Sequence, residues 1–155
     1  IKCEVLEERN GEFELTLVYP SNSELLEGLE KENIIISDAN DYLKNQKFRI
    51  YNTRKLMSNR IEVRARHISF DLARDWIDTI SIDEQSCEYV LNTIFRNSQY
   101  STHYRGYSDI VMTADYRMNK ANCIEAIGGK TGSILDTFGN GAEILRDNTE
   151  IHVLQ

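Results

Sequence analysis

Cysteine is scarce in this sequence, which contains only Cys3, Cys87 and Cys123. The three are far apart and odd in number, and no CxxC pair occurs, so neither a zinc knuckle nor a disulfide framework is predicted. Scattered single cysteines are typical of reduced, buried thiols in a protein made in a cytosol. Histidine is equally sparse and dispersed, with three residues and no pair at helical spacing, so no metal-binding residue is predicted.

Long apolar runs and an excess of basic residues are also absent. No stretch of 18 apolar residues occurs, so no membrane span is predicted, and no charged leader precedes an apolar stretch as in a signal peptide. The net charge is −7, from 25 acidic and 18 basic residues, and an acidic surface repels nucleic acid. The densest basic stretch, residues 60–67, places its arginines at alternating positions, which is typical of one solvated strand face. Nucleic-acid binding is therefore not expected.

The length and the two ends of the chain indicate how many domains it contains and whether it is part of a longer protein. With 155 residues, of which 41% are hydrophobic, the chain is long enough for one domain or for two small ones. It starts at Ile1 rather than at a methionine, and it stops directly after the strand-like residues 150–155. We therefore expect it to be a fragment of a longer protein.

Alternation of apolar and polar residues predicts three β-hairpins. With their turns in parentheses, these hairpins occupy residues 4–19 (Asn10-Gly11), 47–69 (57–59) and 142–155 (Asp147-Asn148). The first turn is the clearest, because an Asn-Gly pair favours the positive φ angles of a tight turn. A short buried strand is predicted at residues 33–37.

Apolar residues at helical spacing predict helices, mostly in the second half of the chain. Residues 69–80 have this spacing, and Ser81 with Glu84 forms a capping box that predicts the start of the clearest helix. The apolar stripe of that helix consists of Cys87, Val90, Leu91, Ile94 and Phe95. Weaker helices are predicted at residues 22–33, at 119–129 with Asn119 as cap, and at 132–139 with Ser133 as cap.

These elements predict an α+β fold, in which β-rich hairpins form a partial barrel-like sheet and a smaller α+β portion follows. The division is placed near Asp83. Residues 1–82 would form a β-rich domain with a terminal helix, and residues 83–155 an α+β domain.

Residues Gly129-Lys130-Thr131 match the end of a Walker A phosphate-binding loop, G-x-x-x-x-G-K-[ST]. The first glycine of that motif would fall at position 124, which is Ile124, and the residues before Gly128 predict a helix where the motif needs a strand. We interpret Gly128-Gly129 as a helix stop. No nucleotide or other cofactor is predicted.

No catalytic constellation stands out. The sequence has no G-x-S-x-G elbow and no H-E-x-x-H motif, and Cys87 and Cys123 both fall on apolar helix faces, which disfavours a cysteine peptidase. The sequence does not exclude a pair of carboxylates that cleaves glycosides, but it indicates no particular pair. His67 has two interpretations, a histidine at the core edge with a backbone partner, or a ligand or catalytic base. We name no catalytic, cofactor-binding or metal-binding residue.

Residues 97–110 are polar and rich in tyrosine, with Tyr100, Tyr104 and Tyr107. This stretch is either a contact surface, because aromatic residues are enriched at interfaces, or an exposed loop without a role.

Three stretches follow one another in an order that matches a known family. Residues 48–77 hold an aromatic-Arg-Ile-Tyr strand, a turn and the motif V-x-A-R-H-I-x-x-D-L, which begins at Val63. Residues 4–20 form an acidic-aliphatic hairpin ending in Tyr-Pro, and residues 126–155 contain A-I-G-G-x-x-G-S-I-L-D followed by a charged hairpin. The ordered set resembles the N-terminal region of the prophage tail endopeptidase, or tail-associated lysin, family of siphophages. One aromatic of the family's usual Phe-Tyr-Asp-Leu is replaced by Ser69.

The resemblance implies a structural component of a phage tail. In this family three copies form a baseplate hub, a ring at the tail tip that docks to the distal tail protein and the tape-measure protein. The expected location is the tail tip of the virion, after synthesis in the cytoplasm of the bacterial host. The family's peptidoglycan-cleaving activity, where present, belongs to C-terminal domains, so this chain is not expected to be an enzyme. The matched motifs are structural, and no catalytic residue is carried over.

Two residues of the matched motif receive structural hypotheses. His67 and Asp71 straddle the predicted strand-to-helix junction, where His67 would bond a backbone group or Asp71. Arg66 would lie on the opposite face and meet a carboxylate of a neighbouring subunit, since rings close through heterologous contacts. Two alternatives to the hub stay open: a peptidoglycan hydrolase or peptidase, and a carbohydrate- or receptor-binding module that uses the tyrosine-rich stretch.

Overall fold

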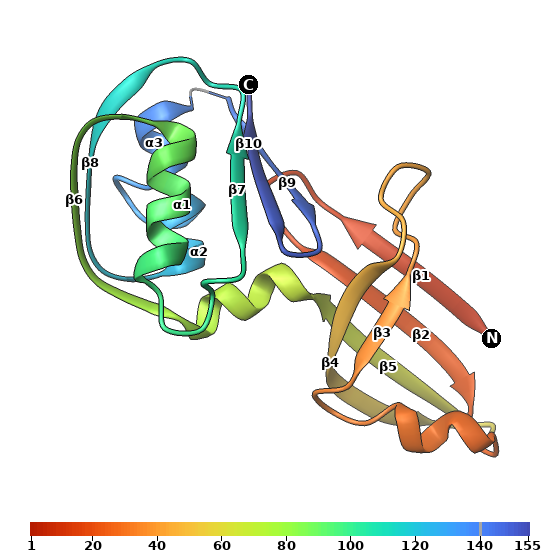
Figure 1. The fold of residues 1–155 in the computed structure, drawn as a ribbon. Helices are drawn as coiled ribbons and strands as arrows, with labels where there is room; N and C mark the ends of the chain where they lie inside the picture. The colour runs from red at the N-terminus through yellow and green to blue at the C-terminus, as the bar shows by residue number, and fades with distance from the viewer. Residues whose placement is uncertain (140) are drawn as a thin grey trace. The chain divides into compact units, whose positions relative to one another are not determined.

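The computed structural model describes residues 1–139 and 141–155. The chain has an α+β fold, as predicted, and forms two compact units, Ile1–Ile68 and Ser69–Gln155 (Figure 1). The division predicted between residues 82 and 83 falls inside a strand of the second unit, Trp76–Ser86.

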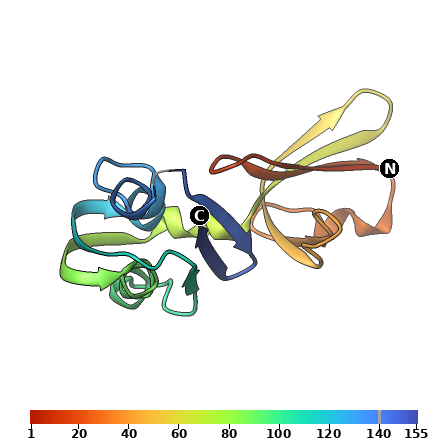
Figure 2. The ribbon, with the colours of Figure 1, turned by 90° about the horizontal axis from the view of Figure 1, so that it is seen from above.

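The first unit is built on one antiparallel sheet of five strands in the order β1-β2-β5-β4-β3. The sheet curls into a half-barrel, which matches the partial barrel expected from the sequence (Figures 1 and 2). Its strands are β1 (Lys2–Glu7), β2 (Phe13–Pro20), β3 (Ile34–Ser37), β4 (Gln46–Leu56) and β5 (Arg60–His67). A 3-10 helix, η1 (Glu24–Gly28), lies where a weak helix was predicted.

Both predicted hairpins of this unit are confirmed. β1 pairs with β2, and Asn10 in the intervening turn has a φ of 54°. β4 pairs with β5 across a turn in which Ser58 and Asn59 also have positive φ angles. Asparagine tolerates this left-handed conformation better than most residues, which favours the turns at Asn10 and Asn59.

One face of the curled sheet carries the core of the first unit. Alternate residues of β2, β4 and β5 point to this face, as strand geometry requires. The buried apolar residues of the unit are Phe13, Leu15, Leu43, Phe48, Ile50, Ile61, Val63, Ala65 and Ile68. The prediction of a buried strand at 33–37 is wrong in one respect: β3 forms, but as an edge strand, and 60% of Ile36 is exposed.

The second unit places helices against two small sheets. β6 (Trp76–Ser86) pairs with β8 (Thr113–Asn122), and the other sheet has the order β7-β10-β9. In Figure 1, α1 lies between the β6–β8 pair and strand β7. The remaining elements are η2 (Ile68–Arg74), α1 (Cys87–Asn97), β7 (Arg105–Ser108), α2 (Cys123–Gly128), α3 (Ile134–Phe138), β9 (Glu143–Asp147) and β10 (Glu150–Leu154).

The prediction of a helix at residues 69–80 is wrong. Only a 3-10 helix, η2, forms there, and Trp76 begins strand β6. Ile77 and Ile80 are both buried, and their spacing of three fits a helix face as well as an irregular strand. The partner strand is irregular here, because Lys120 in β8 has a φ of 45°.

The helices of the second unit begin at polar caps. α1 begins at Cys87 with Ser86 as N-cap, so the capping box predicted at Ser81 and Glu84 is wrong, because both residues belong to β6. α2 is capped by Asn122, in a capping box with Glu125, rather than by Asn119. The cap at Ser133 is confirmed for α3. The predicted apolar stripe of α1 is fully buried in the core of this unit.

Candidate functional site

The Gly-Lys-Thr segment connects helix α2 to helix α3. The backbone N–H groups of Gly129 and Lys130 both donate to the carbonyl oxygen of Glu125, at 3.1 Å each. These donors therefore close the C-terminus of α2, and Gly128-Gly129 is a helix stop, as interpreted from the sequence. A phosphate loop instead follows a strand and aims its N–H groups at the ligand.

Lys130 has a structural task at the irregular point of β8. Its Nζ donates to the carbonyl oxygens of Asn119, at 2.8 Å, and of Lys120, at 2.9 Å. The positive φ of Lys120 accompanies this arrangement, in which one ammonium group satisfies two neighbouring carbonyls. Lys130 thus acts as a clamp on β8.

Replacing Lys130 with methionine should test the clamp, because Lys130→Met removes both hydrogen bonds and keeps an unbranched stem. We expect the free energy of unfolding, measured by urea denaturation, to fall by about 1 kcal/mol, a modest value because the group is exposed. Thr131→Ala is the matched control: its side chain has no hydrogen bond to any described residue, so its effect should stay within about 0.5 kcal/mol. Equal stabilities of the two variants would contradict the clamp.

His67 is sealed in the core of the first unit, with 1% of its surface exposed. Its ring stacks on Phe13 with centroids 4.4 Å apart and meets the edge of Phe48 at 5.6 Å. Its Nε2 lies 3.0 Å from Oε1 of Gln46, which is also buried. The ring does not reach solvent, so the geometry favours the core interpretation over a catalytic base.

Arg66 lies on the opposite face of the sheet from His67, as predicted, and has a carboxylate partner within the chain. Its Nε donates to Oε1 of Glu14 at 2.8 Å, and its guanidinium lies 5.0 Å from the ring centroid of Tyr51. The hydroxyl of Tyr51 donates to the other oxygen of Glu14 at 3.2 Å. Burial, followed by the charge of Glu14, raises the pKa of Tyr51 and keeps its hydroxyl protonated. A contact between Arg66 and a neighbouring subunit stays a prediction.

A second glutamate on the same face is held in the same way. Arg54 and Arg64 both approach Oε1 of Glu62 at 3.1 Å. The side chains of Glu62 and Glu14 are only 15% and 17% exposed, because the arginines cover them. We call this surface the arginine face; it consists of Glu14, Tyr51, Arg54, Glu62, Arg64 and Arg66. Arginine and tyrosine are enriched at protein interfaces, which makes the arginine face the candidate functional surface of this unit.

Asp75, which the sequence analysis did not single out, anchors the start of the tyrosine-rich stretch. Its carboxylate is 2% exposed and accepts backbone N–H groups from Gln99, Tyr100 and Ser101 at 2.7–2.9 Å. Burial alone would raise the pKa of Asp75, but these N–H donors outweigh it and lower the pKa below its usual value. No local signal reveals this role, because the donors lie at least 24 residues away along the chain.

The three tyrosines of that stretch do not gather on one surface. Tyr104 is buried beside Phe95, whereas Tyr100 is 67% exposed. Tyr107 is 41% exposed and stacks on His152 across the β7-β10 pair at 4.9 Å. Tyr100 and Tyr107 are therefore separate exposed rings, and the three tyrosines do not form one binding surface.

The cysteines separate into two environments. Cys87 and Cys123 are buried, as predicted, and burial raises the pKa of Cys123 to about 12, so its thiol is unreactive at neutral pH. The prediction of buried thiols is wrong for Cys3, which is exposed because β1 is an edge strand.

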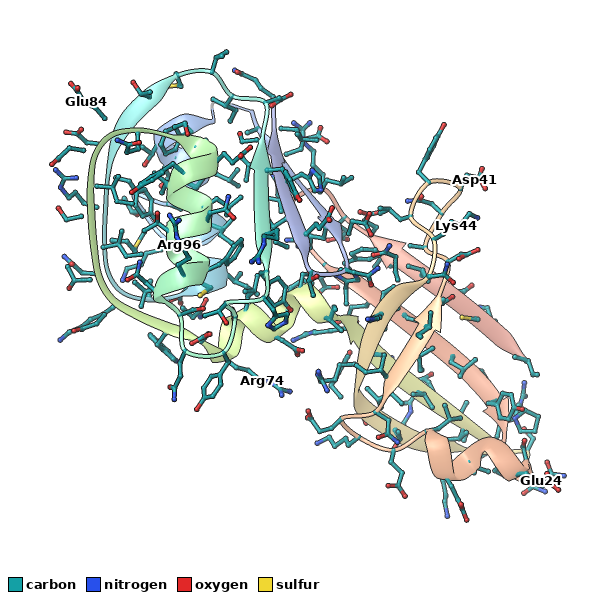
Figure 3. The ribbon with its side chains drawn as sticks, viewed as in Figure 1. Glu24, Asp41, Lys44, Arg74, Glu84 and Arg96 are labelled. Carbon is teal, nitrogen blue, oxygen red and sulfur yellow. The ribbon has the colours of Figure 1, made fainter. Side chains whose placement is uncertain are left out.

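A shallow pocket of about 590 Å³ runs along α1 beside β7. Arg96, labelled in Figure 3, lies at its rim with its guanidinium 5.5 Å from the ring centroid of Tyr89. The other polar groups are engaged: Asn92 donates to the carbonyl of Gly106, and Glu88 accepts the N–H of Ser108. The pocket is therefore a shallow surface groove where α1 packs against β7.

Within residues 1–139 and 141–155, no group of three or more His, Cys, Asp or Glu side chains is arranged to hold a metal ion. Within the same residues, every helix is too short or too polar to cross a bilayer.

The observations define an α+β protein whose curled antiparallel sheet carries an internally paired arginine face. No family model and no curated protein matches the sequence. Among solved structures, the chain is similar to prophage tail protein gp18 from Listeria monocytogenes EGD-e, with a TM-score of 0.73 over 98% of this chain and 16% sequence identity. The chain spans 43% of the length of that structure. At this identity the likeness shows a shared fold.

Proposed function

We propose that the chain is a structural segment of a phage tail tip, a baseplate hub segment of the tail-associated lysin type. In this proposal three copies assemble into a ring that docks to the distal tail protein and the tape-measure protein. The observation that carries the proposal is the shared fold with a prophage tail protein over 98% of the chain. The three ordered motifs in residues 4–20, 48–77 and 126–155 support it independently of the structure.

Open strand edges support an assembling role. β1 and β3 are the two ends of the five-stranded sheet, and among the described residues no further strand pairs with the outer edge of either one. Apolar side chains are exposed on both, with 52% of Leu6 and 60% of Ile36 accessible. Such edges favour pairing with another chain unless something covers them. A ring of subunits would cover them.

The polar clusters support a structural rather than a catalytic role. The carboxylates of Glu14, Glu62 and Asp75 are all engaged by arginines or backbone N–H groups of the same chain. His67 is sealed between aromatic rings, and Cys87 and Cys123 are buried. Groups that are already satisfied hold a fold together, whereas a catalytic group needs access to its substrate.

The proposal is tested by the mass of the full-length protein in solution, measured by light scattering, together with a peptidoglycan-clearing assay on this chain. We expect a mass three times that of one chain and no clearing. Immunogold labelling of purified tails should then mark the tip. A monomer that clears peptidoglycan would overturn the proposal and support the hydrolase alternative.

A further inference from the structure

The arginine face is part of a larger basic surface on the same side of the sheet. Residues that pair across an antiparallel sheet point to the same side, so the pairing of Arg49 with Arg66 places Arg49 beside the arginine face. Lys47 precedes Arg49 by two positions on β4, and Arg60 lies two positions before Glu62 on β5, so both share this side. We call the arginine face together with these three residues the basic surface. Its six cations are Lys47, Arg49, Arg54, Arg60, Arg64 and Arg66, and its two carboxylates are Glu14 and Glu62.

Positive charge is concentrated on the basic surface, although the chain as a whole is acidic. Six cations lie beside two carboxylates there, whereas the net charge of the chain is −7. The side chains of Arg54, Arg64 and Arg66 are 61%, 47% and 50% exposed, and they cover Glu62 and Glu14. A partner therefore meets guanidinium groups first. Such an excess of one charge attracts a partner of the opposite charge and speeds its approach.

The composition of the basic surface favours a protein partner over nucleic acid. Five of its six cations are arginines, and arginine is enriched and lysine depleted at protein interfaces. The carboxylates of this surface, and that of Glu32, which lies 3.9 Å from Arg49, would repel a phosphate backbone. Ile34 and Ile36 lie on the same side, by the pairing of β3 with β4, and are 40% and 60% exposed. Arginine, tyrosine and exposed isoleucine together are typical of a surface that binds another protein.

This side of the sheet has the area of a small specific interface. Five strands spaced about 4.8 Å apart, each about seven residues long, span roughly 24 by 23 Å, or about 550 Å². A standard interface buries about 800 Å² on each partner. We therefore expect a single contact between two proteins to be weak and to gain strength when several contacts act together in a closed ring.

The complementary charge lies in the second unit of the chain. Residues 69–155 contain thirteen acidic and seven basic residues, a net charge of −6. Helix α1 packs against one side of the β6–β8 pair, and in Figure 1 no described helix or strand of this unit covers the other side. The exposed charged residues of β6 and β8 are Asp78, Asp83, Glu84, Asp115, Arg117 and Lys120. We call these residues, together with the exposed Trp76, the acidic surface.

The acidic surface keeps an excess of negative charge, because it has four carboxylates and two cations. Asp83 pairs with Arg117, whereas neither Asp78 nor Glu84 pairs with a cation among the described residues. Glu84, labelled in Figure 3, points away from the helices of this unit. Trp76 is 62% exposed and adds a large aromatic ring. Tryptophan and arginine are among the residues that dominate interfaces, and a guanidinium group stacks favourably on an indole ring.

The charges of the two surfaces decide how copies of the chain meet. Two basic surfaces repel each other, because like charges would be brought together. We infer that the basic surface of one copy binds the acidic surface of a second copy of this chain. The contact joins two different surfaces, so it is heterologous and repeats from copy to copy until a ring closes. The inference rests on the proposed function, because it names the surfaces through which the ring subunits meet.

Two variants of the full-length protein, each with one surface altered, test the contact by light scattering over a range of concentrations. The basic-surface variant carries Arg60→Glu and Arg64→Gln, and the acidic-surface variant carries Asp78→Lys and Glu84→Lys. We expect each variant alone to associate roughly tenfold more weakly than wild type, because the contact loses its opposite charges. An equal mixture should form pairs with one copy of each variant, because the unaltered acidic surface of the first variant still meets the unaltered basic surface of the second.

A charge-changing control separates the contact from the effect of net charge. It carries Lys31→Glu and Lys55→Glu, which alter two exposed cations outside the basic surface, and it should associate like wild type. Raising the NaCl concentration from about 50 to about 500 mM should weaken wild-type association roughly tenfold, because salt screens the charges. Circular dichroism shows whether each variant folds. The milder changes Arg60→Gln with Arg64→Gln, and Asp78→Asn with Glu84→Gln, replace any variant that does not.

The outcomes distinguish the contact from the proposed function. Trimers that persist unchanged in both variants would overturn the contact and leave the proposed ring standing. Association that stays weak in the mixture, or a wild type that is monomeric at every concentration, would also overturn it. If the basic-surface variant assembles like wild type but loses binding to a fluorescent DNA duplex, the surface binds polyanions and the inference fails. If the mixture pairs as expected but immunogold labelling finds no protein on purified tails, the contact stands and the proposed function fails.

Discussion

Replacement of Asp75 by alanine is expected to lower the free energy of unfolding by about 3 kcal/mol, because three backbone N–H groups lose a charged acceptor in a site closed to solvent. The donors are those of Gln99, Tyr100 and Ser101, and the carboxylate that receives them is 2% exposed. Urea denaturation followed by circular dichroism measures the change. The matched control is Asp78→Ala, a nearby exposed aspartate of β6, which should change the value by less than about 0.5 kcal/mol.

The same site predicts a dependence of stability on pH. The pKa of Asp75 is lowered in the folded protein from its usual value of 3.8. The folded state therefore binds the proton less tightly than the unfolded state, and the stability from Asp75 is complete well above pH 3.8. It is lost as the pH falls through the unfolded and then the folded pKa. Wild type should lose stability faster than Asp75→Asn between neutral pH and pH 3; parallel curves would show that the carboxylate charge contributes nothing.

The hairpins and the central helix could be predicted because their signals are local. An alternation of two residues, or an apolar stripe such as that of Cys87 to Phe95, identifies a strand or a helix without knowledge of the rest of the fold. β6 was missed because Ile77 and Ile80 have a spacing that suits a helix, and only pairing with β8 makes this segment a strand. That pairing is a tertiary contact, and tertiary contacts override local spacing.

The surface features were harder to predict than the elements that carry them. The alternation of residues 60–67 places Arg66 opposite His67, and the structure agrees. The partner of Arg66, however, is Glu14, which lies 52 residues away along the chain, and neighbouring sequence contains no sign of it. The exposure of Ile36 and Cys3 likewise follows from the strand order β1-β2-β5-β4-β3, which leaves β1 and β3 at the edges. Strand order depends on long-range pairing, so one sequence does not reveal it.

A methyl group added at Gly106 is expected to lower the free energy of unfolding by about 2–3 kcal/mol, since overpacked cores respond with shifts of this cost. The new Cβ would lie 2.5 Å from Cγ of Leu91 and 2.6 Å from its Cδ2. The backbone cannot easily move away, because the Asn92 side chain bonds both the N–H and the carbonyl of Gly106, at 3.0 and 2.8 Å. Gly28→Ala is the control, since its Cβ would meet nothing within 4 Å.

A double-mutant cycle separates this clash from a general intolerance of alanine at Gly106. Leu91 is fully buried, so Leu91→Ala alone should cost about 3 kcal/mol through the cavity that it leaves. In the double variant the added methyl group of residue 106 enters that space, and the clash disappears. The double variant should therefore be more stable than the sum of the single effects predicts, by about 1–2 kcal/mol. Additive effects would mean that the cost of the added methyl group does not come from its contact with Leu91.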